Sequence, residues 1–157
     1  MTSETIFVWV YLPEELKPVL AGRLTIEHFA GAPLGRFVYR RRYLEDPRAL
    51  SLDPVSLPLH ARIEPFTALK GWPAVILDAL PDRWGMRAID RLIGQQPYPS
   101  GYLLLNDPGR AGNLAFSPTP DTEPAELESR EFPLAELLAA ANALEHDAPV
   151  DPELIKA

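Results

Sequence analysis

Asp82 and Arg83 are an adjacent acid and base, residue types that could take part in catalysis. They lie in the segment 71–94, GWPAVILDALPDRWGMRAIDRLIG, and Trp84 and Gly85 follow directly. Such a pair could serve general acid–base catalysis. We instead expect Asp82 to cap a helix, because aspartate is favoured at that position, and Arg83 to be exposed.

Other candidate groups give no catalytic constellation. The three histidines, His28, His60 and His146, are far apart in the sequence, and the chain has no cysteine. Gly109 and Gly112 lack the lysine and the strand–loop–helix setting of a phosphate-binding loop. We therefore expect no catalytic residue, no bound cofactor and no metal site in this chain.

One basic cluster lies in the N-terminal third, at Arg36 and the run Arg40, Arg41 and Arg42. It could contact phosphate groups or an acidic partner. We favour a solvated strand face whose charges guard a sheet edge, because the chain as a whole has a net charge of -7. Direct nucleic-acid binding is not expected.

The bulk properties fit one domain, or one domain with a short appendage. The 157 residues are 46% hydrophobic and 24% charged, so the chain can bury a core. No stretch of roughly 18 apolar residues occurs, and the N-terminus has no basic region before an apolar run. We expect a cytoplasmic protein with no signal peptide and no membrane association.

The N-terminal third reads as β-structure. Strands are predicted at residues 5–12, 19–29 and 35–44, where β-branched and aromatic residues concentrate, and a brief edge strand at 55–57. Both faces of the first strand are apolar, so we expect it to be central or covered on both sides. Gly22 marks a bulge or a turn in the second strand.

A helical pair follows. Trp72, Val75, Ile76, Ala79 and Leu80 recur at helical spacing, and Pro81 ends that helix. Asp82 then begins a second helix, which Gly94 ends. Its predicted apolar stripe comprises Trp84, Ala88, Ile89, Leu92 and Ile93.

The remainder contains shorter elements. We expect a short buried helix or strand at 102–105, a turn at 106–109, and a strand through Leu114 and Phe116. A loop at 118–132 precedes an amphipathic helix that Pro133 opens, and Asp151 is typical of a further helix start. The fold class is thus α+β: a small antiparallel sheet or open barrel, a helical pair and a C-terminal amphipathic helix.

Residues 77–85 (LDALPDRWG), with Arg87 and Arg91, resemble the L-L-P-D-x-W-G stretch of HipA-type serine/threonine kinase toxins of type II toxin–antitoxin systems. The match rests on Leu80, Pro81, Asp82, Trp84 and Gly85. Three further segments resemble that family in order: residues 8–12 (VWVYL), 55–59 (VSLPL) and 109–118 (GRAGNLAFSP). Asn113 departs from the small residue usual at its position.

The resemblance implies the family's N-terminal domain. Residues 1–117 would form this β-rich domain with its helical pair, 118–132 a linker, and 133–157 a helix and the start of a connection to an absent kinase core. ATP and magnesium belong to that core in the family, and none of its catalytic motifs has a matching position here. The chain alone is therefore not expected to be an enzyme.

Two functions follow from the resemblance. One is a non-catalytic domain of a HipA-like kinase, present as a fragment or truncated product, which packs on the kinase core and helps antitoxin binding; a HipB-like DNA-binding antitoxin is then a further partner. The short helix start at Asp151 favours this one. The other is a stand-alone antitoxin resembling HipS, which restrains a separate kinase chain. An independent enzyme with a dispersed site is disfavoured.

Docking would be the mechanism in both cases. Tryptophan and arginine dominate interface energetics, so both types in the helical pair are candidates. We expect Trp72 and Trp84 to pack in the core. Arg83, Arg87 and Arg91 are the expected partner contacts.

Overall fold

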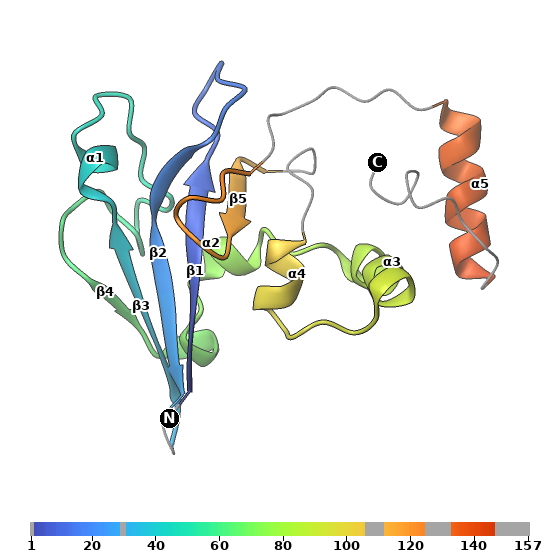
Figure 1. Ribbon diagram of the computed structural model, residues 1–157, viewed down its shortest axis with the longest axis horizontal. Coiled ribbons are helices and arrows are strands. Elements are labelled where there is room, and N and C mark those ends of the chain that lie inside the picture. The colour runs from blue at the N-terminus through green and yellow to red at the C-terminus, as the bar shows by residue number, and fades with distance from the viewer. Residues whose placement is uncertain (1, 29–30, 106–111, 125–132, 147–157) are drawn as a thin grey trace.

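The computed structural model describes residues 2–28, 31–105, 112–124 and 133–146 (Figure 1). Its centre is an open five-stranded sheet in the order β4-β3-β2-β1-β5, with every neighbouring pair antiparallel. The strands are β1 (Thr2–Val10), β2 (Val19–His28), β3 (Pro33–Tyr39), β4 (Glu64–Phe66) and β5 (Leu114–Ser117). The helical elements are α1 (Arg41–Leu44), η1 (Ala68–Gly71), α2 (Ala74–Leu77), α3 (Arg83–Ile93), α4 (Ser100–Leu104) and α5 (Leu134–Glu145). The predicted α+β fold with an N-terminal antiparallel sheet is confirmed, and the sheet is not closed into a barrel.

Strand β1 is interior, as its two apolar faces predicted. Its inner side chains include Val8 and Val10 and enter the main core, whereas Trp9 packs in a second cluster on the outer face. The register slips by one residue where Val8 faces Gly22 and Trp9 faces Leu20. The predicted irregularity at Gly22 is therefore a β-bulge.

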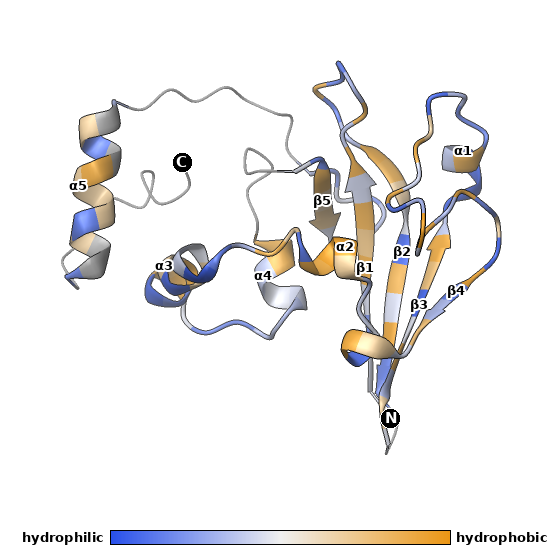
Figure 2. Cartoon of the chain, turned by 180° about the vertical axis from the view of Figure 1, so that it is seen from behind, coloured by the Kyte–Doolittle hydropathy of each residue, from blue (hydrophilic) through white to orange (hydrophobic). Residues whose placement is uncertain are grey.

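One continuous core joins the sheet to the helical half. The inner side chains of β1, β2 and β3 meet side chains from the segments that follow, and Trp72, Ile76 and Leu103 are all buried among them. Figure 2 shows the resulting contrast: β1 is largely hydrophobic and α3 is largely hydrophilic.

The predicted third strand, 35–44, is too long. Strand β3 ends at Tyr39, and residues 41–44 form the short helix α1. The helical turn brings Tyr43 back over Tyr39, with the rings stacked at 5.8 Å. Burial of this second ring therefore favours a turn where strand propensity alone favoured extension.

The predicted edge strand at 55–57 is also wrong. Asp53 accepts hydrogen bonds from the backbone N–H groups of Val55, at 3.2 Å, and Ser56, at 3.0 Å, which curls the chain into a turn. Only an isolated bridge links Asp53 to Leu57. The short strand beside β3 is instead β4, which pairs Phe66 with Gly35.

The helical pair is confirmed, with a first helix shorter than predicted. Pro73 is extended, with ψ of 137°, so α2 begins only at Ala74 and makes a single turn before Asp78. Helix α3 runs from Arg83 to Ile93, and Gly94 ends it with φ of 87°. The element predicted at 102–105 is the helix α4, and the predicted strand through Leu114 is β5.

The C-terminal helix is α5, and Pro133 precedes it as predicted. The turn predicted at 106–109, most of the linker 118–132 and the helix start at Asp151 lie outside the described residues. No helix in the ranges described above is long and apolar enough to cross a membrane.

Candidate functional site

Helix α3 carries the motif that the sequence singled out, and its start is capped as predicted. Asp82 is extended, with ψ of 175°, and its Oδ1 accepts a hydrogen bond of 2.7 Å from the backbone N–H of Gly85. This bond satisfies one of the N–H groups that a helix start leaves without a partner. The carboxylate of Asp82 therefore has a structural task.

The remaining motif residues also have structural tasks. Leu80 packs against the main core, and Pro81 is buried. Gly85 is buried in the first turn of α3. Helix α2 ends at Leu77, so the prediction that Pro81 ends it is wrong; Pro81 lies in the connection to α3, which leads away from the sheet (Figure 1).

The face of α3 that meets the rest of the protein is narrow. Gly85, Ala88 and Ile89 are its buried residues, and two of these three are small. The predicted apolar stripe continues through Leu92 and Ile93, which are 40% and 58% exposed. The stripe is therefore only partly covered by the described part of this chain.

The three arginines proposed as partner contacts lie on α3, spaced by four residues. Arg83, Arg87 and Arg91 are all exposed, and this spacing places them along one side of the helix. Arg91 takes part in an interaction within the chain, so Arg83 and Arg87 are the better candidates for an external partner. The structure thus joins a basic row to exposed apolar side chains on one helix.

A hydrogen bond ties α3 to α4. The hydroxyl of Tyr102 donates to Oδ1 of Asp90 at 2.6 Å, and this bond to a carboxylate raises the pKa of Tyr102. Tyr98, between the two helices, contacts Tyr102 edge to face at 6.4 Å and is 65% exposed. The α3–α4 hairpin, which we define as residues 83–105, therefore combines a fixed interior with exposed apolar groups.

The two tryptophans of the helical pair differ in their surroundings. Trp72 is 4% exposed and belongs to the main core, as predicted. Trp84 is half-buried and belongs to neither of the two buried clusters, so the prediction of full core packing fails for it. Because the buried face of α3 is narrow, the indole ring of Trp84 lies at the edge of the packed core.

The basic cluster of the N-terminal third does not form one strand face. Arg36 on β3 pairs with Glu27 on β2, whereas Arg41 on α1 pairs with Glu45 at 2.8 Å. Arg40 and Arg42 are exposed. The end of β3 at Tyr39 divides the cluster between two elements, which is why the predicted single face does not exist.

Two of the three histidines lie beside glutamates on the surface. His28 is 3.6 Å from Glu4, and His60 is 2.6 Å from Glu64. Among the residues that the structure describes, no group of three His, Cys, Asp or Glu side chains could hold a metal ion. His146 ends helix α5.

The sequence did not predict how far the apolar side chains of the hairpin are exposed. Periodicity placed Leu92 and Ile93 in the apolar stripe of α3. Leu105 was predicted to lie in a buried element but is 44% exposed, and no sequence signal marked Tyr98, which is 65% exposed. These exposed side chains could have been found only by asking which other segments of the chain are able to cover α3.

Comparison of the sequence with models of protein families and with curated proteins finds no match.

Proposed function

We propose that this chain is a non-catalytic docking domain that packs on a protein kinase core of the HipA type, in cis or in trans. The single observation that carries the proposal is the exposure of apolar and arginine side chains on the α3–α4 hairpin. Helix α3 presents a row of exposed arginines and, at its C-terminal end, the exposed side chains of Leu92 and Ile93. Interfaces combine buried apolar groups with arginine in this way.

The four segments that resemble the HipA family give further support. Val10, Leu57 and Phe116, one from each of three segments, are buried in the main core, and Leu80 of the fourth packs against it. The segments therefore meet in a single folded body, as parts of one domain would. Their residues support packing and capping, which suits a scaffold that presents α3.

A kinase core in the same chain and one in a separate chain would use the same surface. The reading frame immediately downstream distinguishes the two arrangements. A continuing frame with a Gly-rich segment and kinase motifs would correspond to a domain in cis, and a separate kinase frame to a HipS-like antitoxin in trans. The absence of both would count against the proposal.

Calorimetric titration of the purified chain into a HipA-type kinase core that lacks its own N-terminal domain tests the docking surface. The variant Arg87→Glu/Ile93→Ser reverses one charge and removes one apolar contact on α3. We expect it to weaken binding by at least about 30-fold, since a central arginine and a buried aliphatic side chain each contribute about 1–2 kcal/mol.

The matched control is Arg62→Glu/Ile63→Ser. It makes the same two chemical changes at adjacent exposed positions before β4, where Ile63 is 59% exposed. We expect this variant to bind as the unmodified chain does. Equal weakening by both variants would show a general charge effect and would refute the α3 surface. Magnesium-dependent ATP turnover by the chain alone, above a mock-purified sample, would refute the non-catalytic role.

A further inference from the structure

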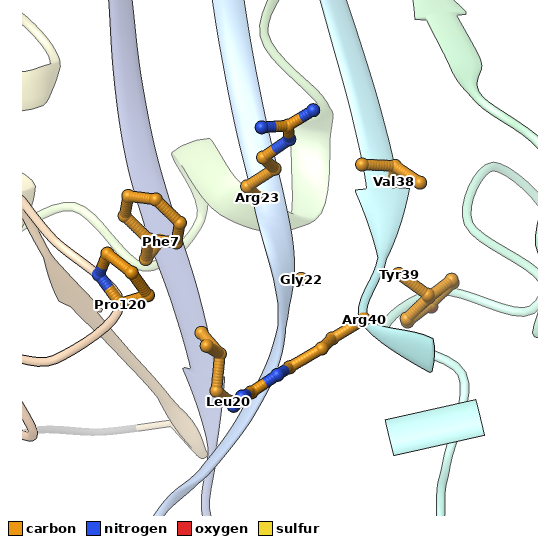
Figure 3. A pocket seen from close by; sticks show the side chains of 8 residues that line it. All are labelled: Phe7, Leu20, Gly22, Arg23, Val38, Tyr39, Arg40 and Pro120. Atoms are coloured by element: carbon orange, nitrogen blue, oxygen red, sulfur yellow. The ribbon is translucent and has the colours of Figure 1, made fainter. Parts of the chain in front are cut away.

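The outer face of the sheet, opposite the main core, contains a pocket of about 310 Å³ between β1, β2 and β3. Its walls are apolar and its two ends are basic (Figure 3). Phe7, Leu20, Val38 and Pro120 form the walls, and Arg23 and Arg40 supply the charges. The volume is near the lower end of the range of about 300–1,000 Å³ for ligand sites, so one large side chain fits.

One wall of this pocket is held in place by a hydrogen-bond relay. The indole N–H of Trp9 donates to Oγ of Ser117 at 2.7 Å, and that hydroxyl donates to the carbonyl oxygen of Thr119 at 2.7 Å. Thr119 and Thr122 then share a hydrogen bond of 2.7 Å between their hydroxyl groups. Pro120 lies inside this turn, which holds it at the edge of the pocket.

The two arginines are available to an anion. Arg23 and Arg40 are exposed, and neither forms an ion pair with another residue that the structure describes. Arg36, farther along the same face, is already neutralised by Glu27. Two uncompensated guanidinium groups in a chain of net charge -7 define a local site for negative charge.

We propose that this pocket binds an extended acidic peptide of a partner protein, with one large apolar side chain between two carboxylates. This site is separate from the α3–α4 hairpin and does not depend on the proposed function. Each carboxylate would pair with one guanidinium, and the apolar side chain would fill the space between Phe7, Leu20 and Pro120. Arginine and carboxylate form charge-assisted hydrogen bonds, which fix the orientation of the peptide.

The pocket lies along the strands, so we take the peptide to be extended. Arg23 pairs with Val38 across the β2–β3 ladder, and the backbone N–H of Arg40 donates to the carbonyl of Ala21. The side chain of Arg40 runs toward Leu20, and that of Arg23 points away from it (Figure 3). In an extended peptide every second side chain lies on the same face, so one residue separates each acid from the apolar residue between them. The expected pattern is therefore acid–x–apolar–x–acid.

Two peptides of identical composition test this pattern by NMR titration of the nitrogen-15-labelled full chain. The first is acetyl-Glu-Ser-Phe-Ser-Glu-amide, and the permuted control is acetyl-Glu-Glu-Phe-Ser-Ser-amide. We expect the first to cause saturable shifts at residues 20–23 and 38–40 and to bind at least about fivefold more tightly than the control. Arg23→Ala/Arg40→Ala should weaken binding by at least about tenfold, and Arg62→Ala should not change it.

Several outcomes would overturn the inference. If the two peptides bind with equal affinity, the predicted spacing of the acids is refuted. If the first peptide binds the double arginine variant as tightly as the unmodified chain, the role of Arg23 and Arg40 is refuted. Adipate, a free dicarboxylate without the apolar side chain, should bind more weakly than the first peptide. Adipate that binds as tightly would assign the pocket to a small acid rather than to a peptide. Retained amide shifts elsewhere in the spectrum show that the variants are folded.

Discussion

At the scale of single residues, two tyrosine hydroxyls hold the long connection after β3. The hydroxyl of Tyr39 donates to the carbonyl oxygen of Leu57 at 2.6 Å and accepts from the backbone N–H of Leu52 at 2.9 Å. Tyr43 does the same with Leu50, at 2.7 Å and 3.1 Å. Each hydroxyl thus pairs one donor and one acceptor of a segment that has little secondary structure of its own.

Replacing Tyr39 with phenylalanine tests this role. The variant keeps the ring in the core but leaves the backbone groups of Leu52 and Leu57 without the hydroxyl. We expect the free energy of unfolding, measured with urea, to fall by about 1–3 kcal/mol. Tyr98→Phe is the control, because Tyr98 is 65% exposed, and it should change little. Equal stability of both variants would contradict the assigned role.

The same residue predicts a loss of stability at high pH. Burial raises the pKa of Tyr39 from 10.0 to about 12, and burial also raises that of Tyr43. A group whose pKa is raised on folding contributes full stability below its unfolded pKa and loses this contribution as the pH rises through its folded pKa. The unfolding free energy should therefore decrease between pH 10 and pH 12, and less steeply in Tyr39→Phe. An unchanged slope in that variant would contradict the prediction.

Asp82 is the residue at which a hydrogen-bonded helix cap and a simple charge effect make different predictions. Asp82→Ala should lower the unfolding free energy by about 1 kcal/mol, because Gly85 loses its partner. Asp82→Asn retains an acceptor oxygen and should be nearly neutral. Chemical denaturation of both variants measures the difference. If Asp82→Asn proved as unstable as Asp82→Ala, the charge rather than the cap would be the stabilising feature.

At the scale of elements, β3 and η1 approach each other so closely that two glycines are required. A Cβ atom added to Gly35 would lie 1.7 Å from the carbonyl oxygen of Gly71. The chain reaches this position through three successive residues of positive φ: Leu69 at 50°, Lys70 at 57° and Gly71 at 85°. The contact anchors the segment that leads into Trp72 and α2.

Gly35→Ala should therefore lower the unfolding free energy by more than about 3 kcal/mol, because backbone must move to admit the methyl group. Gly31→Ala is the matched control. No atom lies within 4 Å of a Cβ at Gly31, so we expect a change within about 0.5 kcal/mol. Thermal and urea unfolding measure both, and a neutral Gly35→Ala would contradict the close approach of β3 and η1.

The elements that sequence predicts well are those with a strong local signal. Enrichment in β-branched and aromatic residues, with both faces apolar, predicted the interior strand β1. Asp82 and Gly94 predicted the boundaries of α3, whereas Pro81 did not mark the end of α2, which lies at Leu77. The turn at Leu69 and Lys70 has no such signal, since neither residue type favours positive φ. The end of β3 at Tyr39 depends on the ring of Tyr43 reaching the core, which is a property of packing rather than of local sequence.

In the candidate site, too, sequence predicted the features with a local signal and missed those that depend on packing. Sequence predicted the cap at Asp82 and the arginines of α3, because caps and charged rows follow from spacing along the helix. It did not predict the exposure of Leu92 and Ile93, because the apolar stripe gives no information on what covers it. The outer pocket brings together Phe7, Arg23 and Pro120, which no local pattern relates.

At the scale of the whole molecule, the protein consists of a packed core and an exposed helical surface. The sheet and the segments packed on its inner face contain the main core and fix the fold. Helix α4 packs on this body through Leu103, and α3 extends away from it (Figure 1). The α3–α4 hairpin presents arginines and apolar side chains that the described part of the chain leaves exposed. This division suits a docking domain, whose contribution is the placement of a surface.

Hydrogen exchange of the chain with and without a HipA-type kinase core tests the docking claim most directly. The account predicts that the partner slows exchange of backbone amides in α3 and α4 and leaves β2 and β3 nearly unchanged. Arg87→Glu/Ile93→Ser should abolish this protection. Protection confined to the sheet, or no protection at partner concentrations sufficient for complex formation, would contradict the docking role of the α3–α4 hairpin.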